Sequence, residues 1–157
     1  EAVIIQMTWP GAPTVYYGDE AGVCGFTDPD NRRTYPWGHE DKELIDFHKA
    51  AIKMHKENEV LRTGSYKQLY SAHNVIAYGR FTSDDAVIVV VNNGEDEIRV
   101  NIPAWETGLA MDDDVEQIMV TFEGGYSTDR QGYRLKDGIL NIGLRKTSAT
   151  VLRRLRW

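Results

Sequence analysis

The sequence contains one cysteine, Cys24, among its 157 residues, so it cannot form an internal disulfide bond, and a lone thiol without partner ligands makes no metal site. Its longest hydrophobic run, residues 86–91, is far too short to cross a bilayer as a helix. Basic residues are few, with 18 Lys and Arg against 24 Asp and Glu. Because nucleic-acid binding needs a broad basic face, the sequence does not predict a nucleic-acid partner. The short hydrophobic runs likewise do not predict a membrane-spanning helix.

The composition is that of an ordinary packed protein. Hydrophobic residues make up 41% of the chain and aromatic residues 10%, which argues against disorder. The length suits one domain, or one small domain with an appendage.

Two segments near the N-terminus are candidate helices. Residues 1–9 are mostly apolar, and their periodicity fits a buried strand and a helix end equally well. From Asp41 onward, apolar side chains recur at helical spacing, with acids at the start and lysines near the end, as the helix dipole prefers. This pattern predicts a helix that stops at Asn58.

After Asn58 the period changes to two, which predicts a mainly β fold. About eight short strands are expected, at residues 66–70, 75–81, 86–91, 98–102, 117–122, 133–135, 139–142 and 149–152. The β-branched run 86–91 indicates a central strand covered on both faces. Lys136–Gly138 is expected to join its two neighbouring strands as a tight hairpin. Short strands separated by turn signals are typical of an antiparallel β-sandwich with Greek-key connections.

The connector at residues 61–65 is short and is not a flexible linker. We therefore expect the sandwich to dock directly against the preceding helix, with little independent motion.

Residues 10–37 combine a β-prone run, Thr14–Tyr17, with a loop rich in carboxylate, amide and guanidinium groups. Polar groups at the C-terminal end of a parallel strand are where α/β barrels place their ligand chemistry. From composition alone, a turn-rich connector with solvated charges is the simpler interpretation.

The order of these residues favours the functional interpretation. The pattern G-x-P-x-x-Y-Y-G-D-E followed by D-P-x-N-R resembles the end of the catalytic barrel in the α-amylase family of glycoside hydrolases, especially the neopullulanase, cyclomaltodextrinase and amylopullulanase group. The matching residues are Gly11, Pro13, Tyr16, Tyr17, Gly18, Asp19, Glu20, Asp28, Pro29, Asn31 and Arg32.

The resemblance implies two parts. Residues 1–60 would be the end of a (β/α)8 barrel, with the end of its seventh helix, its eighth strand, the substrate loop and its last helix. Residues 61–157 would be a C-terminal β-sandwich domain that mainly shields the barrel end. In this view Tyr16 and Tyr17 fill a core layer of the barrel.

The resemblance also implies that Asp28 and Arg32 bind glucose units on the non-reducing side of the cleavage point, without taking part in bond chemistry. Carboxylates and guanidinium groups suit vicinal hydroxyls. A simpler alternative is that Arg32 pairs with Asp28 or Asp30 as a bridge that stabilises the loop. Tyr35 and Trp37 could stack on a sugar, although hydrophobic anchoring of the loop is the more economical interpretation.

Retaining glycosidases need a carboxylate nucleophile and a general acid roughly 5 Å apart. In the family these groups lie on barrel strands upstream of the eighth, so the resemblance implies that the chain is a fragment, without catalytic residues and inactive alone. The runs Asp84–Asp85 and Asp112–Asp114 are expected to be a turn and a solvated loop rather than replacements. His48 and His55 are expected to pack on a helix face.

The expected ligand of the intact enzyme is an α-glucan oligosaccharide, from starch-like glucans, pullulan or cyclodextrins. No cofactor is expected in this chain, and calcium in the parent protein is left open, as are the specificity and the compartment. Barrel elements without their neighbours leave unpaired strand edges and bare apolar faces. Residues 1–38 are therefore expected to be poorly ordered, swapped between self-associated chains, or covered by the upstream barrel half.

One alternative belongs to a different class, a non-catalytic β-sandwich module that binds carbohydrate or protein. Such a module would expose an aromatic platform, for which the candidates are Tyr66, Tyr70, Tyr78, Trp105 and Tyr126. Their period-two positions indicate that several face inward, which favours the sandwich as a structural brace.

Overall fold

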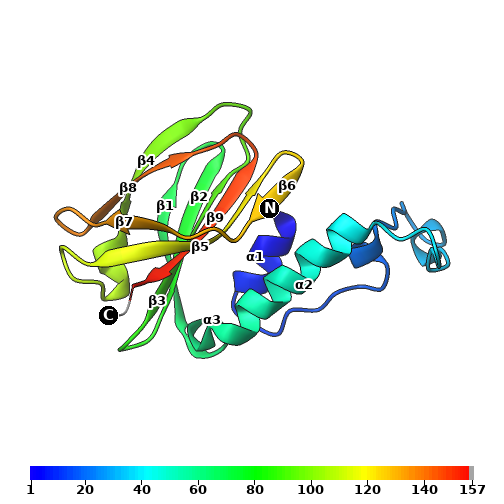
Figure 1. The fold of residues 1–157 in the computed structure, drawn as a ribbon, viewed down its shortest axis with the longest axis horizontal. Coiled ribbons are helices and arrows are strands. Elements are labelled where there is room, and N and C mark those ends of the chain that lie inside the picture. The colour runs from blue at the N-terminus through cyan, green and yellow to red at the C-terminus, as the bar shows by residue number, and fades with distance from the viewer. Residues whose placement is uncertain (156–157) are drawn as a thin grey trace.

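The computed structural model describes residues 1–155, which form a β-sandwich with helices against one side and a long loop that projects away from it (Figure 1). Three helices precede the strands: α1 (Ala2–Thr8), α2 (Lys42–Glu57) and α3 (Glu59–Thr63). The strands are β1 (Ser65–Ser71), β2 (Val75–Phe81), β3 (Ala86–Asn92), β4 (Ile98–Pro103), β5 (Asp114–Phe122), β6 (Gly125–Ser127), β7 (Gln131–Arg134), β8 (Ile139–Leu144) and β9 (Ser148–Arg154). Short 3₁₀ turns lie at Asp19–Ala21, Asp30–Arg32 and Ala104–Thr107.

The strands form two antiparallel sheets. The larger sheet has the order β1-β2-β3-β9-β5-β6, with β7 also paired to β5, and the smaller sheet consists of β4 and β8. Successive strands cross between the sheets, because β3 and β5 belong to the larger sheet and β4 between them to the smaller one. The predicted mainly β, antiparallel sandwich is confirmed.

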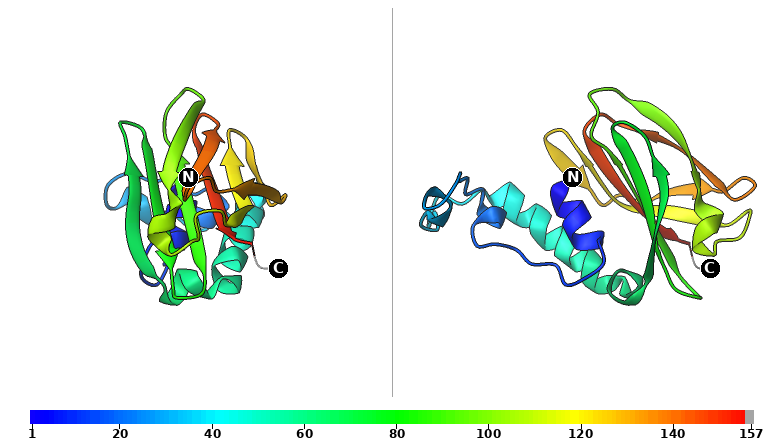
Figure 2. Two further views of the ribbon diagram at one scale, coloured as in Figure 1. Left: turned by 90° about the vertical axis from the view of Figure 1, so that its left-hand side faces the viewer. Right: turned by 180° about the vertical axis from the view of Figure 1, so that it is seen from behind.

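Each face of the larger sheet is covered by a separate hydrophobic core. One core fills the space between the two sheets and includes Ile88, Ile102 and Leu140. The other lies between the larger sheet and the helices, which Figure 2 shows on one side of that sheet, and it includes Ile4 and Met54. Strand β3 is buried along its whole length, as its β-branched sequence predicts.

The helix predicted from Asp41 to Asn58 is confirmed as α2, and its ends are capped by the residues that bound it. The Asp41 carboxylate accepts a hydrogen bond from the Leu44 N–H at 2.9 Å. At the other end, the Asn58 side-chain amide donates to the Met54 carbonyl at 2.7 Å. Residues 1–8, for which periodicity left two interpretations open, are helical.

A buried polar network joins α1 to the sheet. The Arg80 guanidinium, 2% exposed, donates to the carbonyls of Thr8 at 2.9 Å and Gly64 at 2.8 Å. The hydroxyls of Thr8 and Tyr78 share a hydrogen bond of 2.6 Å. His55 Nδ1 lies 2.7 Å from the Met7 carbonyl oxygen. The last carbonyls of α1 are thus satisfied by side chains far away in sequence, which fixes the helix on the sheet.

Burial also changes the acid–base properties of this network. Desolvation raises the pKa of Tyr78 to about 12 and lowers the pKa of Arg80. Burial is the main cause of both shifts. The Tyr78 phenol is therefore neutral at ordinary pH, and the Arg80 guanidinium is held by the carbonyl oxygens of Thr8 and Gly64.

The strand expected at Thr14–Tyr17 is not formed. These residues are extended or turn-like and have no ladder partner, since a barrel strand depends on its two neighbours for hydrogen bonds. Residues 1–38 were expected to be poorly ordered, swapped between chains or covered by the upstream barrel half. For α1 this is wrong, because Ile4 and Met7 are buried against the sheet of the same chain.

The turn at Lys136–Gly138 was expected to join the strands before and after it as a hairpin, but those two strands do not pair with each other. The tight turn exists, with positive φ at Asp137 and Gly138 and a single bridge between Lys136 and Ile139. Strand β7 then pairs with β5, and β8 pairs with β4 in the other sheet. The turn signal located the reversal of the chain, but partner choice depended on long-range packing that the local sequence does not encode.

Candidate functional site

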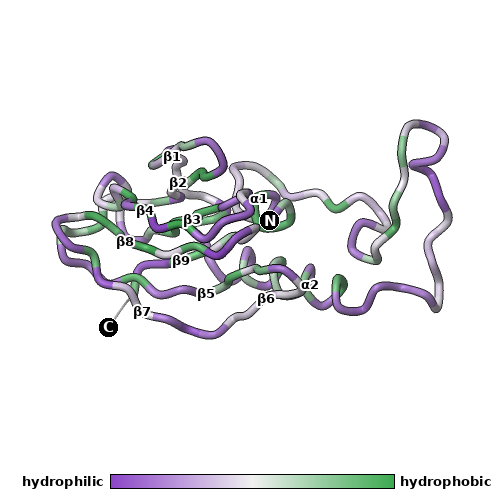
Figure 3. The backbone as a smooth tube through the Cα atoms, turned by 90° about the horizontal axis from the view of Figure 1, so that it is seen from above, coloured by the Kyte–Doolittle hydropathy of each residue, from purple (hydrophilic) through white to green (hydrophobic). Residues whose placement is uncertain are grey.

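The loop between α1 and α2 is a long excursion that Figure 3 shows extending beyond α2. A hydrogen bond from the Asp41 N–H to the Ala21 carbonyl at 3.1 Å closes the outer part of this segment, residues 22–40. Gly18 and Gly22, both with φ in the left-handed region, allow the turn at Asp19–Ala21. Residues 22–40 therefore form a loop whose base lies next to the first turn of α2.

The predicted substrate residues lie together near the tip of this loop. Arg32 Nε is 2.7 Å from Asp28 Oδ1, and the two side chains are 69% and 59% exposed. Arg32 belongs to the 3₁₀ turn Asp30–Arg32, which follows a cis peptide bond between Asp28 and Pro29. The bridge that the sequence left as an alternative is thus present in the free chain, and it is made with Asp28.

A second ion pair holds the shape of the loop, and the sequence analysis missed its arginine. Arg33 donates to both oxygens of Asp30, at 2.9 Å and 3.0 Å. Asp30 also accepts a hydrogen bond from the Phe26 N–H at 3.1 Å. The i, i+3 spacing of Asp30 and Arg33 is the sequence feature that could have indicated this ion pair. Asp30 and Arg33 thus form a scaffold, and the neighbouring Asp28–Arg32 pair projects from it.

Aromatic side chains lie on the same loop and face solvent. Phe26 is 84% exposed and Trp37 is 80% exposed, with the Trp37 ring 4.6 Å from that of Tyr35. The interpretation of Trp37 as a hydrophobic anchor is therefore wrong for this chain, because it has no core to enter. Tyr16 and Tyr17 are likewise exposed rather than packed in a core layer.

Acidic groups surround the Tyr35 phenol. Desolvation, followed by the carboxylates of Glu20 and Glu40, raises the pKa of Tyr35, and Glu20 shares a hydrogen bond with it. Glu40 itself accepts backbone N–H bonds, including one from Gly38 at 3.0 Å, which lower its pKa. The loop thus presents neutral phenols, carboxylates and guanidiniums together, the mixture that binds sugar hydroxyls.

Of the other acidic runs, Asp84–Asp85 lies in a turn, as expected, whereas Asp112–Asp114, expected as a solvated loop, is held in ion pairs, and Asp114 begins β5. Asp112 and Asp114 both pair with Arg134, and Asp113 pairs with Arg154 at 3.0 Å. The Asp84 and Asp85 N–H groups donate to the Thr82 hydroxyl in a turn. Asp84 and Asp85 also line a pocket that Arg153 and Arg154 line with them.

Two of the four histidines pack on the face of α2. His48 and His55 are buried on α2 and contact backbone carbonyl oxygens, which confirms the sequence prediction. Within residues 1–155, three or more metal-ligating side chains do not gather at any one place. Over the same range, no helix is both long and apolar enough to cross a membrane.

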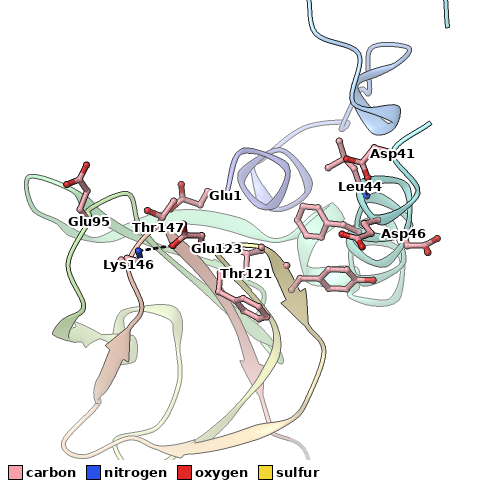
Figure 4. A pocket seen from close by; sticks show the side chains of 15 residues that line it. Glu1, Asp41, Leu44, Asp46, Glu95, Thr121, Glu123, Lys146 and Thr147 are labelled. Carbon is pink, nitrogen blue, oxygen red and sulfur yellow. Dashed lines mark hydrogen bonds and ion pairs between the residues drawn. The ribbon is translucent and has the colours of Figure 1, made fainter. Parts of the chain in front are cut away.

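A groove of about 1100 Å³ lies away from the loop tip, between the start of α2 and the β5–β6 hairpin (Figure 4). Phe47 and Tyr126 line it, with ring centroids 5.2 Å apart. Glu123 and Lys146 pair across its edge at 2.7 Å, and this hydrogen bond lowers the pKa of Glu123 and raises that of Lys146. Asp28 and Arg32 do not line this groove, so it is separate from the predicted substrate site.

The aromatic candidates on the sandwich do not form a platform. Tyr78 is fully buried, and three others are partly buried, packing against the hydrophobic cores: Tyr66, Tyr70 and Tyr126. Only Trp105 of the five is exposed.

Comparison with known proteins gives a consistent result. An amylopullulanase from Thermoanaerobacter thermohydrosulfuricus is 46% identical over 105 residues, covering 60% of this chain and 7% of that protein. A cyclomaltodextrinase from Thermoanaerobacter pseudethanolicus is 42% identical over 94 residues, covering 59% of this chain and 16% of that protein. The chain therefore spans only a small part of the curated relatives it matches. No family model matches it.

Solved structures extend the similarity to the fold of nearly the whole chain. An α-amylase from Geobacillus thermoleovorans, complexed with acarbose, superposes with a TM-score of 0.83 at 24% identity and covers 99% of this chain and 32% of its own. A debranching enzyme from Nostoc punctiforme gives a TM-score of 0.74 at 23% identity, over 96% of this chain and 28% of its own. Sequence and fold together confirm that the chain is similar to a part of α-amylase-family glycoside hydrolases.

Proposed function

We propose that this chain is part of a retaining glycoside hydrolase that acts on α-glucosidic bonds of starch-like glucans, pullulan or cyclodextrins, and that its loop binds the substrate. The observation that carries the proposal is the exposed Asp28–Arg32 pair, within the motif that prompted the family resemblance. The names of the relatives support the substrate class.

Asp28 and Arg32 bind and orient the glucan in this proposal. In the free chain they neutralise each other at 2.7 Å, and both remain exposed to solvent. Vicinal sugar hydroxyls can replace the pair, donating to the carboxylate and accepting from the guanidinium. Such remote contacts hold the scissile bond in place and contribute to catalysis through positioning.

The chain alone does not hydrolyse glucans in this proposal. A retaining mechanism needs two carboxyl groups about 5 Å apart, one as nucleophile and one as acid, across the scissile bond. In this proposal those two groups come from barrel strands that precede the substrate loop, as the family resemblance implies.

The proposed division is residues 1–60 as the end of the barrel and residues 61–157 as the terminal sandwich. The sandwich acts as a brace: Arg80 and Tyr78 hold the end of α1, from which the loop departs. Burial of Tyr78 and partial burial of Tyr66, Tyr70 and Tyr126 disfavour a platform-type binding module.

A chimera tests the role of the loop. Residues 11–40 would replace the corresponding segment of the Thermoanaerobacter pseudethanolicus cyclomaltodextrinase, and the chimera would be assayed on maltooligosaccharides. Asp28→Ala in the chimera is expected to raise KM about tenfold, the loss of one charge-assisted contact. Thr34→Ala, at an exposed position of the same loop, is the matched control and should leave KM within about twofold. Equal effects of the two changes would contradict a binding role for Asp28.

A further inference from the structure

The groove between the start of α2 and the β5–β6 hairpin takes no part in the proposed substrate site. Its volume is about 1100 Å³, and its walls come from elements that are far apart in sequence. Figure 4 shows Leu44 and Asp46 on the α2 side and Thr121 and Glu123 on the strand side. A groove of this size between a helix and a hairpin has room for several side chains of a partner.

Aromatic side chains form the apolar part of this groove. The rings of Phe47 and Tyr126 lie 5.2 Å apart, and both side chains pack against the core under the helices while they remain partly exposed. Phe122 also lines the groove, and the Arg145 guanidinium lies 5.0 Å from the centre of its ring. The aromatic lining therefore favours apolar side chains, whose contact removes it from water, and it tolerates a cation beside it.

Carboxylates outnumber cations in the lining of the groove. The carboxylates that line it are those of Glu1, Asp41, Glu43, Asp46, Glu95 and Glu123. Lys146, which lines it as well, is already paired with Glu123 at 2.7 Å. Glu43 and Glu95 are exposed and make no ion pair within the part of the chain that the structure describes. The groove therefore keeps a surplus of negative charge that a cationic partner would complement.

One carboxylate oxygen of the lining is buried without a hydrogen-bond donor. Glu1 Oε1 is shielded from water, and among the side chains of residues 1–155 it is the buried polar atom that has no partner. Desolvation raises the pKa of Glu1, although the N-terminal amine opposes this shift. Because buried acceptors are normally paired, this oxygen indicates a donor that comes from a partner.

We propose that this groove binds an amphipathic helix that carries lysine or arginine beside its apolar face. The apolar side chains of such a helix cover Phe47 and Tyr126, as in other helix-in-groove complexes. Its cations lie against Glu43 on α2 and Glu95 after β3. An acidic helix is excluded, because its carboxylates would face those of the groove. The inference goes beyond the proposed function, since the substrate residues do not line the groove.

Fluorescence anisotropy of labelled peptides with the full chain tests the proposal. One peptide consists of leucine and lysine in an order that places the leucines on one face of a helix, and the other has glutamate in place of lysine. The chain is expected to bind the lysine peptide at least about tenfold more tightly than the glutamate peptide. Binding should weaken between about 50 mM and about 300 mM salt, because the rim charges are exposed and therefore screened.

Two double variants locate the binding surface. Glu43→Gln/Glu95→Gln removes two exposed charges from the groove and should weaken binding of the lysine peptide about fivefold. Glu97→Gln/Asp129→Asn removes two exposed charges outside the groove and is the matched control, expected to bind within about twofold of wild type. Phe47→Leu, with its fold verified by circular dichroism, should weaken binding about threefold through loss of the ring.

Equal weakening by the two double variants would overturn the inference, because the peptide would then respond only to the net charge of the chain. A wild-type chain that binds neither peptide, or both peptides alike, would overturn it as well. These results leave the proposed function untouched, since that is judged by the KM values of the chimera.

Discussion

The sandwich and the substrate loop are stabilised in opposite ways. Residues 65–155 are stabilised by two hydrophobic cores and by ladders between strands distant in sequence. Residues 22–40 rely mainly on ion pairs between residues a few positions apart, such as Asp28–Arg32 and Asp30–Arg33, and on hydrogen bonds to the neighbouring segment, such as that from the Tyr17 hydroxyl to the Arg33 carbonyl. The loop carries the Asp28–Arg32 pair, for which we propose a role in sugar binding, and exposed rings, whereas the sandwich carries the buried network that holds α1. The proposed binding residues thus lie on the region with little packing of its own.

Amide hydrogen exchange gives the largest expected contrast. Residues 44–55 of α2 should exchange slowly, near the rate set by global unfolding, because Ala51 and Met54 are buried against the sheet. Residues 22–40 should exchange quickly, since their few hydrogen bonds are local and exposed. Fast exchange at residues 44–55 would contradict the docking of the sandwich on α2.

Arg80→Met is expected to lower the free energy of unfolding by about 3 kcal/mol, because the Thr8 and Gly64 carbonyls lose a buried donor. Urea denaturation monitored by circular dichroism measures the change. Arg99→Met is the matched control, because Arg99 is exposed and its guanidinium donates to the exposed Asn141 side chain; the change should cost less than about 0.5 kcal/mol. Similar losses from both variants would show that the buried network does not join α1 to the sheet.

Alkaline pH should weaken the same buried network between α1 and the sheet. The pKa of Tyr78 is raised to about 12, so its folded state holds a proton that the unfolded state releases near pH 10. The stability contributed by Tyr78, on the order of 3 kcal/mol for a shift of about two units, is complete below pH 10 and is lost as the pH rises through about 12. Urea unfolding of wild type and Tyr78→Phe at pH 9 and pH 11.5 isolates this contribution. A pH dependence that is identical in both proteins would refute it.

Arg32→Ala should have the smallest effect on stability, within about 0.5 kcal/mol, because its ion pair with Asp28 is exposed. Thermal unfolding measures it, with Arg33→Ala, which breaks the other loop pair, as the comparison. A large loss of stability from Arg32→Ala would favour the loop-bridge interpretation over a binding role.

Much of the fold was predictable because the relevant signals are local. The β-branched run 86–91 indicated a strand buried on both faces, and Asp41 and Asn58 marked the ends of α2. The short strand β6 was missed, since three residues carry too little periodicity. The strand expected at Thr14–Tyr17 is not formed, because strand formation depends on neighbours that the segment itself does not supply.

The candidate site shows the same limit. The motif located Asp28 and Arg32, and their charges and spacing made the observed bridge one of the stated alternatives. The exposure of Trp37 and the burial of Arg80 could not be predicted, because both depend on what packs against the segment rather than on the residue itself. Local chemistry was thus more predictable than burial.

An assay of the purified chain tests the central claim most directly. Its intact mass would be measured beside its activity on a chromogenic maltooligosaccharide. A chain of 17.8 kDa without turnover is the predicted result, because the proposal takes both catalytic carboxylates from elsewhere in the enzyme. Turnover by a chain of that mass would contradict the account, since residues of this chain would then have to supply the nucleophile and the acid.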